Sequence, residues 1–319
     1  MIVILIYLIP FIVAFGTVYV LVPVMKDTAV KIKFVDQPNK RKIHHNPIPL
    51  MGGVIIYLGC ICSMLIFDGF SSRTLTLLIG GTMLLFTGLM DDWYKTKGLD
   101  FPVLPRIIVY LLAASVPIYY GLEIKGITNI TGQGMIFFPS WISWVVTILW
   151  VFCITNMINF IDGVDGLATG IVTISACTLF VVSMLKDQQG SAIMAIIIVA
   201  CCLAFLAYNF YPAKIFMGDA GAIFLGYALA ILSLDGALKS ATVVSIIVSV
   251  FAIGVPIFDT IFVLIRRMIQ NKGLHKADNL HTHHSLMKWG LTQIQTVSFL
   301  YLIGVVFSLL SIIIFLVFK

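Results

Sequence analysis

The residues best suited to chemistry lie in one short polar stretch, 156–166, between two long apolar segments. Side-chain oxygens recur there at every third position, at Asn156, Asn159, Asp162 and Asp165. Carboxylate and amide oxygens are the donors that Mg²⁺ and phosphate-bearing substrates require. Gly163 and Gly166 interrupt a helix and let the backbone approach a ligand closely. The structural alternative is a polar turn in which Asp-Gly pairs reverse the chain.

Two further acidic sites border apolar segments. Asp91 and Asp92 close one of them, and two adjacent carboxylates repel each other. Such a pair either binds a cation or keeps one member protonated, which suits a general base; capping of the next turn is the alternative. Asp219 opens another segment between Gly218 and Gly221, where it can be a metal ligand or a helix cap.

Two histidine groups suggest contacts with phosphate. The first group, His44 and His45, follows three consecutive cations and precedes Gly52-Gly53, whose N–H groups begin a span. Its alternative is an ordinary basic loop beside lipid headgroups. The second group falls within four positions, at His281, His283 and His284. We favour diphosphate binding there over zinc, because adjacent side chains point apart and no cysteine is near; a solvated loop is the other alternative.

Asp259 lies inside a long apolar segment, three residues after Pro256. An ionisable residue within a span is a functional candidate by default. Pairing with Arg266 or Arg267, one to two turns further on, is the simpler expectation. Pro256 predicts a kink in this segment.

The composition is that of a polytopic membrane protein. The 319 residues are 60% hydrophobic and 11% charged, with a mean hydropathy of +1.07. The apolar runs have the length of helices rather than the roughly ten-residue alternation of a barrel. The net charge of +6 therefore does not indicate nucleic acid, because Lys and Arg orient membrane proteins and meet anionic headgroups. The six cysteines lie in apolar runs and are interpreted as small apolar side chains.

Ten apolar segments predict an all-α integral membrane bundle of about ten transmembrane helices in a single domain, 1–319. The first segment lacks a basic n-region and is interpreted as a span rather than a signal peptide. The segments are 2–25, 51–67, 74–90, 106–120, 141–158, 167–185, 191–211, 220–234, 241–265 and 296–318.

The connections between these segments alternate between two sides. One side holds 15 of the 20 Lys and Arg residues, in the loops 26–50, 91–106, 159–166, 212–219 and 266–295. The positive-inside rule places this side in the cytoplasm and both termini outside. The histidines and the motif carboxylates share this side. This placement favours a lipid-bordered cytoplasmic site over a secondary transporter of an anionic solute, whose polar residues gather near mid-bilayer.

Taken together, the motifs resemble the polyprenyl-phosphate N-acetylhexosamine-1-phosphate transferases of glycosyltransferase family 4. The resemblance extends from about Asp36 to Gly290 and rests on the acidic pair, the 156–166 stretch, Met217-Gly218-Asp219 and the second histidine group, in that order. The stretch 36–42 is similar to the branch that uses UDP-N-acetylglucosamine and starts teichoic acid, O-antigen and related glycopolymers. The phospho-MurNAc-pentapeptide transferase of peptidoglycan synthesis is the alternative. Three positions depart from the residues usual in the family: Ala222, Asn279 and Ser285.

The resemblance implies transfer of N-acetylglucosamine-1-phosphate from UDP-N-acetylglucosamine to undecaprenyl phosphate, with release of UMP, in a bacterial plasma membrane. It implies Mg²⁺, or Mn²⁺, held by Asn159 and Asp219. Asp91 would deprotonate or position the acceptor, and Asp92, Asp162 and Asp165 would complete an acidic floor. The expected substrate-binding residues are Asn156, His44, His45, Arg267, His281, His283 and His284.

Direct attack by the lipid phosphate is expected rather than a phosphoryl-enzyme, because one membrane-edge site can hold both substrates. The expected partners are the two substrates and the bilayer, with a homodimer but no nucleic acid. A CDP-alcohol phosphatidyltransferase is a further rival, but the Ala-Arg that should follow its first Asp-Gly is missing here.

Overall fold

A computed structural model describes residues 2–37, 47–128, 134–236, 242–270 and 281–318. His44 and His45 lie outside the described residues. Two short antiparallel strand pairs accompany the helices: β1 (Val35–Asp36) with β2 (Ile48–Pro49), and β3 (Gly126–Thr128) with β4 (Met135–Phe137). The helices are α1 (Ile2–Lys31), α2 (Gly52–Phe67), α3 (Ser72–Thr96), α4 (Val103–Tyr119), α5 (Ser140–Ile161), α6 (Leu167–Leu185), α7 (Gln189–Asn209), α8 (Gly218–Gly236), α9 (Val243–Ala252), α10 (Gly254–Ile269), α11 (Thr282–Lys288) and α12 (Gln293–Val317).

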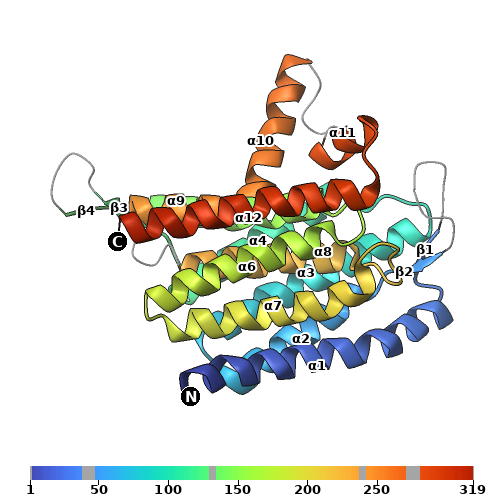
Figure 1. Ribbon diagram of the computed structural model, residues 1–319, viewed down its shortest axis with the longest axis horizontal. Coiled ribbons are helices and arrows are strands. Elements are labelled where there is room, and N and C mark those ends of the chain that lie inside the picture. The colour runs from blue at the N-terminus through green and yellow to red at the C-terminus, as the bar shows by residue number, and fades with distance from the viewer. Residues whose placement is uncertain (1, 38–46, 129–133, 237–241, 271–280, 319) are drawn as a thin grey trace.

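The predicted all-α membrane bundle is confirmed. Every expected apolar segment coincides with a helix, and the ninth is divided into α9 and α10. Seven of the described helices are long and apolar enough to cross a membrane, and the bent pair α9–α10 is an eighth candidate. The helices α2 and α4 are apolar but shorter, so a count of ten crossings stays a prediction. Both chain ends lie at the same end of the bundle (Figure 1).

Helix α8 lies at the centre of the molecule. Nearly all of its residues are buried, and it packs against α2, α3, α5 and α6. Glycines allow these helices to approach closely: a Cβ on Gly88 would lie 2.3 Å from Ala220 Cα, and one on Gly53 would lie 2.3 Å from Gly221 N. Small residues at helix contacts are the usual means of close packing in membranes. This packing brings α2 and α3 to the N-terminus of α8.

The kink predicted near Pro256 is confirmed as a break. Helices α9 and α10 meet at an angle of 82° at Ile253. Pro256 lies in the first turn of α10, where the N–H that proline lacks is not needed for the helix. As a result, α10 projects away from the bundle, and the short helix α11 lies beside it (Figure 1).

Candidate active site

The site begins with the carboxylate of Asp92, which caps α8. One of its oxygens accepts the N–H of Asp219 at 2.9 Å, and the other accepts the N–H of Ala220 at 3.2 Å. A helix N-terminus presents free N–H groups and positive potential, which the oxygens of a carboxyl group complement. Gly218 has a φ of +68°, and a Cβ on it would lie 2.4 Å from Asp92 Oδ2. The capping role considered for the acidic pair therefore applies to Asp92, but on a helix far along the chain.

Lys95 bridges the other two carboxylates, and Arg106 is a second cation beside one of them. The Nζ of Lys95 lies 2.5 Å from Asp219 Oδ2 and 3.5 Å from Asp91 Oδ2. Arg106 Nη1 lies 3.3 Å from the same oxygen of Asp91. The sequence reasoning missed both Lys95 and Arg106. Lys95 follows Asp91 by four residues in one helix, and this spacing could have predicted the pairing.

Asp162 faces the same cluster from the end of α5. Its N–H caps the helix by donating to Asn159 O at 3.3 Å. Desolvation, followed by the negative charge of Asp219, raises the pKa of the Asp162 carboxyl to about 7, although Lys95 opposes the shift. A carboxyl with such a pKa exchanges a proton near neutral pH, which is the property required of a general acid or base.

Two further polar residues of the 156–166 stretch bond to backbone groups. Asp165 accepts the N–H of Ala213 at 2.9 Å and so connects this stretch to the segment before α8. Asn156 donates to Phe152 O at 2.7 Å, within its own helix.

The N–H groups of Gly52 and Gly53, considered as phosphate donors, are already bonded to the carbonyls of Phe216 and Met217 at 3.0 and 2.9 Å.

The expected partner of Asp259 was Arg266 or Arg267, but the structure pairs it with the histidine group. Asp259 Oδ2 lies 2.7 Å from His281 Nδ1, and Oδ1 accepts the N–H of Thr282 at 2.7 Å. Arg266 instead donates to Ser285 Oγ at 2.8 Å. Asp259 therefore joins the bent helix α10 to the first turn of α11.

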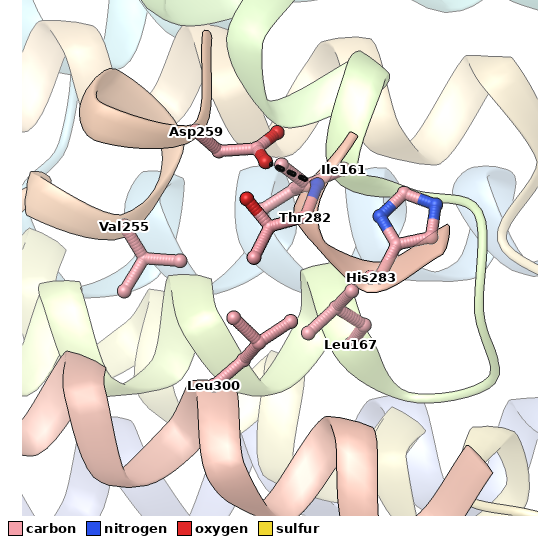
Figure 2. Close-up of a pocket in the computed structure, with 7 residues that line it drawn as sticks. All are labelled: Ile161, Leu167, Val255, Asp259, Thr282, His283 and Leu300. Atoms are coloured by element: carbon pink, nitrogen blue, oxygen red, sulfur yellow. Dashed lines mark hydrogen bonds between the residues drawn. The ribbon is translucent and has the colours of Figure 1, made fainter. Parts of the chain in front are cut away.

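His283 is buried rather than open to the site. Its side chain is 1% exposed, and a Cβ on Gly163 would lie 2.5 Å from its Nε2. Figure 2 shows its ring beside a small pocket; the residues that line the pocket are Ile161, Leu167, Val255, Asp259, Thr282, His283 and Leu300. Burial, followed by the neighbouring His284, lowers the pKa of His283 to about 3, so the ring is neutral. Within the described residues neither ring nitrogen has a hydrogen-bond partner.

The chemistry of the donor set fits a hard divalent cation. The carboxylates of Asp91 and Asp219 converge on the ammonium of Lys95, and oxygen is the donor that Mg²⁺ prefers. Among the described residues no three His, Cys, Asp or Glu side chains already form a metal cage. This is compatible with Mg²⁺, which keeps waters and substrate phosphates among its ligands.

Comparison with known proteins places the chain in a family. Residues 74–237 match glycosyl transferase family 4. A probable undecaprenyl-phosphate N-acetylglucosaminyl 1-phosphate transferase of Bacillus subtilis is 36% identical over 314 residues, which cover 95% of this chain and 83% of that protein. The chain belongs to glycosyl transferase family 4. A decaprenyl-phosphate N-acetylglucosaminephosphotransferase of Mycobacterium tuberculosis is 30% identical over 308 residues, covering 87% of this chain and 75% of that protein.

In this family 4 chain, the predicted carboxylates and the predicted histidine group lie in two places. Three of the predicted carboxylates, with Asp162 beside them, meet at the ends of α3, α5 and α8: Asp91, Asp92 and Asp219. The histidine group lies on α11, against α10 and the end of α5, where the rings of His281 and Phe160 are 5.9 Å apart. Arg267 lies in the last turn of α10.

Proposed function

We propose that this chain transfers N-acetylglucosamine-1-phosphate from UDP-N-acetylglucosamine to undecaprenyl phosphate, giving undecaprenyl-diphospho-N-acetylglucosamine and UMP. The observation that carries the proposal is the cluster of Asp91 and Asp219 around Lys95 at one end of a membrane bundle, with Asp162 within range of their charges. The names of the relatives, which describe polyprenyl-phosphate acceptors and N-acetylglucosamine, support the choice of substrates.

The cluster has the charges that this reaction needs. A lipid phosphate oxygen attacks the sugar-bearing phosphorus of the donor, and the bond from that phosphorus to the UMP oxygen breaks. Positioned positive charge is the main catalytic contribution in phosphoryl transfer. Lys95 and Arg106 supply fixed cations beside Asp91, which positions the acceptor. Asp162 accepts the proton of an acceptor phosphate that arrives protonated, because its pKa is near 7.

We assign the expected Mg²⁺, or Mn²⁺, to Asp219 and Asn159. Asp219 is 19% exposed in its side chain and carries the closest contact to a cation in the cluster. Asn159 lies in the last turn of α5, three residues before Asp162. When bound, the ion neutralises the diphosphate and stabilises the departing UMP.

The acceptor lipid needs an opening to the bilayer, and α10 provides an apolar border for one. Its exposed side chains include Phe258, Ile261, Phe262 and Ile265, and Arg266 and Arg267 lie near its end. In this proposal the site faces the cytoplasm of a bacterial cell, and the chain termini lie on the outer side of the plasma membrane. Both termini lie together at one end of the bundle, whereas β1 and β2 lie at the other (Figure 1).

The experiment is UMP release by purified full-length protein with undecaprenyl phosphate and Mg²⁺. We expect UMP with UDP-N-acetylglucosamine and none with UDP-MurNAc-pentapeptide. UMP from only the second donor would move the chain to peptidoglycan synthesis. No UMP from either would refute the proposal. UMP release without the lipid acceptor would indicate a phosphoryl-enzyme route instead of direct attack.

A further inference from the structure

Asp259 is a buried acid with two short and specific contacts. Its carboxylate is 5% exposed in the side chain and lies within hydrogen-bond distance of two groups on α11, His281 Nδ1 and Thr282 N, both at 2.7 Å. Figure 2 shows Asp259 directed from α10 toward Thr282. These contacts use both carboxylate oxygens, so the acid fixes both the start of α11 and the ring of its first histidine.

The contact with Nδ1 decides which ring nitrogen remains available. An ionised carboxylate only accepts hydrogen bonds, so Nδ1 carries the proton that faces Asp259. The described residues place no hydrogen-bond partner on Nε2, and the His281 side chain is 13% exposed. His281 lies beside Phe160, which is next to Asn159 in the last turn of α5. His281 is therefore held beside the end of α5, the helix that ends just before Asp162.

We propose that Asp259 is a positioning residue: it holds α11 in place and, by accepting the Nδ1–H of His281, fixes the ring so that Nε2 is presented to the diphosphate of the sugar donor. A hydrogen bond to an ionised carboxylate is about twice as strong as one between neutral groups, and an orienting carboxylate is the usual means of fixing an imidazole. The inference rests on the proposed transferase function and adds a role for a residue outside the carboxylate cluster.

The substitution Asp259→Asn separates this role from a merely structural one. The amide oxygen still accepts the N–H of Thr282, so α11 stays docked. The amide nitrogen, however, donates to His281 Nδ1, so that Nδ1 becomes an acceptor and the ring loses its carboxylate partner. An amide in place of the carboxylate that orients a catalytic histidine is known to preserve geometry while disabling the site.

We expect Asp259→Asn to lower kcat/KM for UDP-N-acetylglucosamine roughly tenfold to hundredfold, the effect of losing one hydrogen bond to a charged group. The melting temperature and the KM for undecaprenyl phosphate should stay the same. In a His281→Ala background the same substitution should cause no further loss, because Asp259 then has no ring to position. The control is Asp187→Asn, on an exposed loop residue whose φ of +54° asparagine tolerates.

Full activity of Asp259→Asn, or an equal loss in the His281→Ala background, would overturn the inference. Hydrogen exchange of the peptide 282–288 provides a readout that does not need activity. Asp259→Ala should accelerate exchange there, and Asp259→Asn should not. Unchanged exchange in Asp259→Ala would also overturn the inference. If the wild-type protein releases no UMP, the proposed function fails, while the exchange measurement still tests whether Asp259 holds α11.

Discussion

At the scale of single residues, the cluster depends on charges that compensate one another at short range. Asp91 and Asp92 are 2% and 1% exposed, so neither carboxylate is stabilised by bulk water. Asp92 is stabilised by backbone N–H groups, and Asp91 by Lys95 and Arg106. An uncompensated buried charge is strongly destabilising, so each of these partners is needed for the fold as well as for chemistry.

Lys95 should compete with the metal for Asp219. We expect Lys95→Met to lose nearly all UMP release and to unfold more easily, by about 1–2 kcal/mol, since Lys95 is 45% exposed and solvent weakens the pair. Mg²⁺ should raise the melting temperature of this variant more than that of the wild type, because the ion no longer displaces an ammonium. The control is Lys97→Met, because Lys97 stacks on the ring of Trp93, 3.5 Å from its centroid. An equal effect of Mg²⁺ on all three proteins would contradict the metal assignment.

The raised pKa of Asp162 predicts that both the stability of the protein and the rate of UMP release depend on pH. Its pKa is about 7 in the fold, against an unfolded value near 4, so the folded state binds the extra proton between these values. Stability should therefore decrease as pH rises from about 4 to 7 and then level off. Asp162→Asn should remove this part of the pH dependence. If the ionised form is the base, UMP release should rise with pH through the same range in the wild type only, measured under saturating substrates. If the melting temperature changes by the same amount from pH 4 to 7 in the wild type and in Asp162→Asn, the assignment is contradicted.

At the scale of elements, the antiparallel helices α3 and α8 form the frame of the site. Asp92 at the end of α3 caps the start of α8, and Arg73 at the start of α3 binds Asp235 at the end of α8 at 2.8 Å. Between these contacts glycines keep the helices close; a Cβ on Gly80 would lie 2.0 Å from the hydroxyl of Tyr227. The site residues on these two helices therefore move only if the pair moves.

Gly218 should be essential for the cap. Alanine at this position meets two penalties, a φ of +68° and a Cβ 2.4 Å from Asp92 Oδ2. Gly69→Ala is a matched control, because Gly69 has a φ of +60° and no atom within 4 Å of its Cβ position. We expect the left-handed strain to cost each variant about 1–2 kcal/mol in unfolding free energy. Only Gly218→Ala should also lose UMP release, by tenfold or more, because its Cβ displaces Asp92. Equal activity of the two variants would show that the cap does not matter for catalysis.

The elements also show how far the sequence predicts the structure. Apolar run length predicts the helices, and the order and sidedness of the motifs predict that Asp91 and Asp219 lie at one end of the bundle. The sequence could not predict that Asp92 caps a helix 127 positions away, or that Asp259 selects His281 rather than the nearer arginines. These contacts depend on helix packing and on the 82° break before α10. Local spacing carries no information about either.

At the scale of the whole molecule, a second polar cluster of the described residues lies at the opposite end of α3 and α8 from the carboxylate cluster. The second cluster joins Arg73 to Asp68 at 2.9 Å and to Asp235 at 2.8 Å, and Ser191 donates to Asp235 at 2.6 Å. It connects α3, α7 and α8 where the chain has no predicted motif. We interpret it as a structural clamp, in contrast to the cluster at Asp91 and Asp219, for which we propose substrate binding.

Arg73→Met tests this division of roles across the molecule. Asp235 is 2% exposed, so removal of Arg73 leaves a buried charge without its cation and should cost about 3 kcal/mol or more in unfolding free energy. Lys125→Met is the contrasting control, because Lys125 is 62% exposed and lies 3.9 Å from Glu123, a pair worth less than about 1 kcal/mol. Thermal unfolding should distinguish the two variants clearly. Both should keep wild-type kcat and KM for UMP release below their melting temperatures, because the clamp and the carboxylate site lie at opposite ends of α3 and α8. A change in KM in Arg73→Met, with the fold intact, would show that the clamp also sets the geometry of the site.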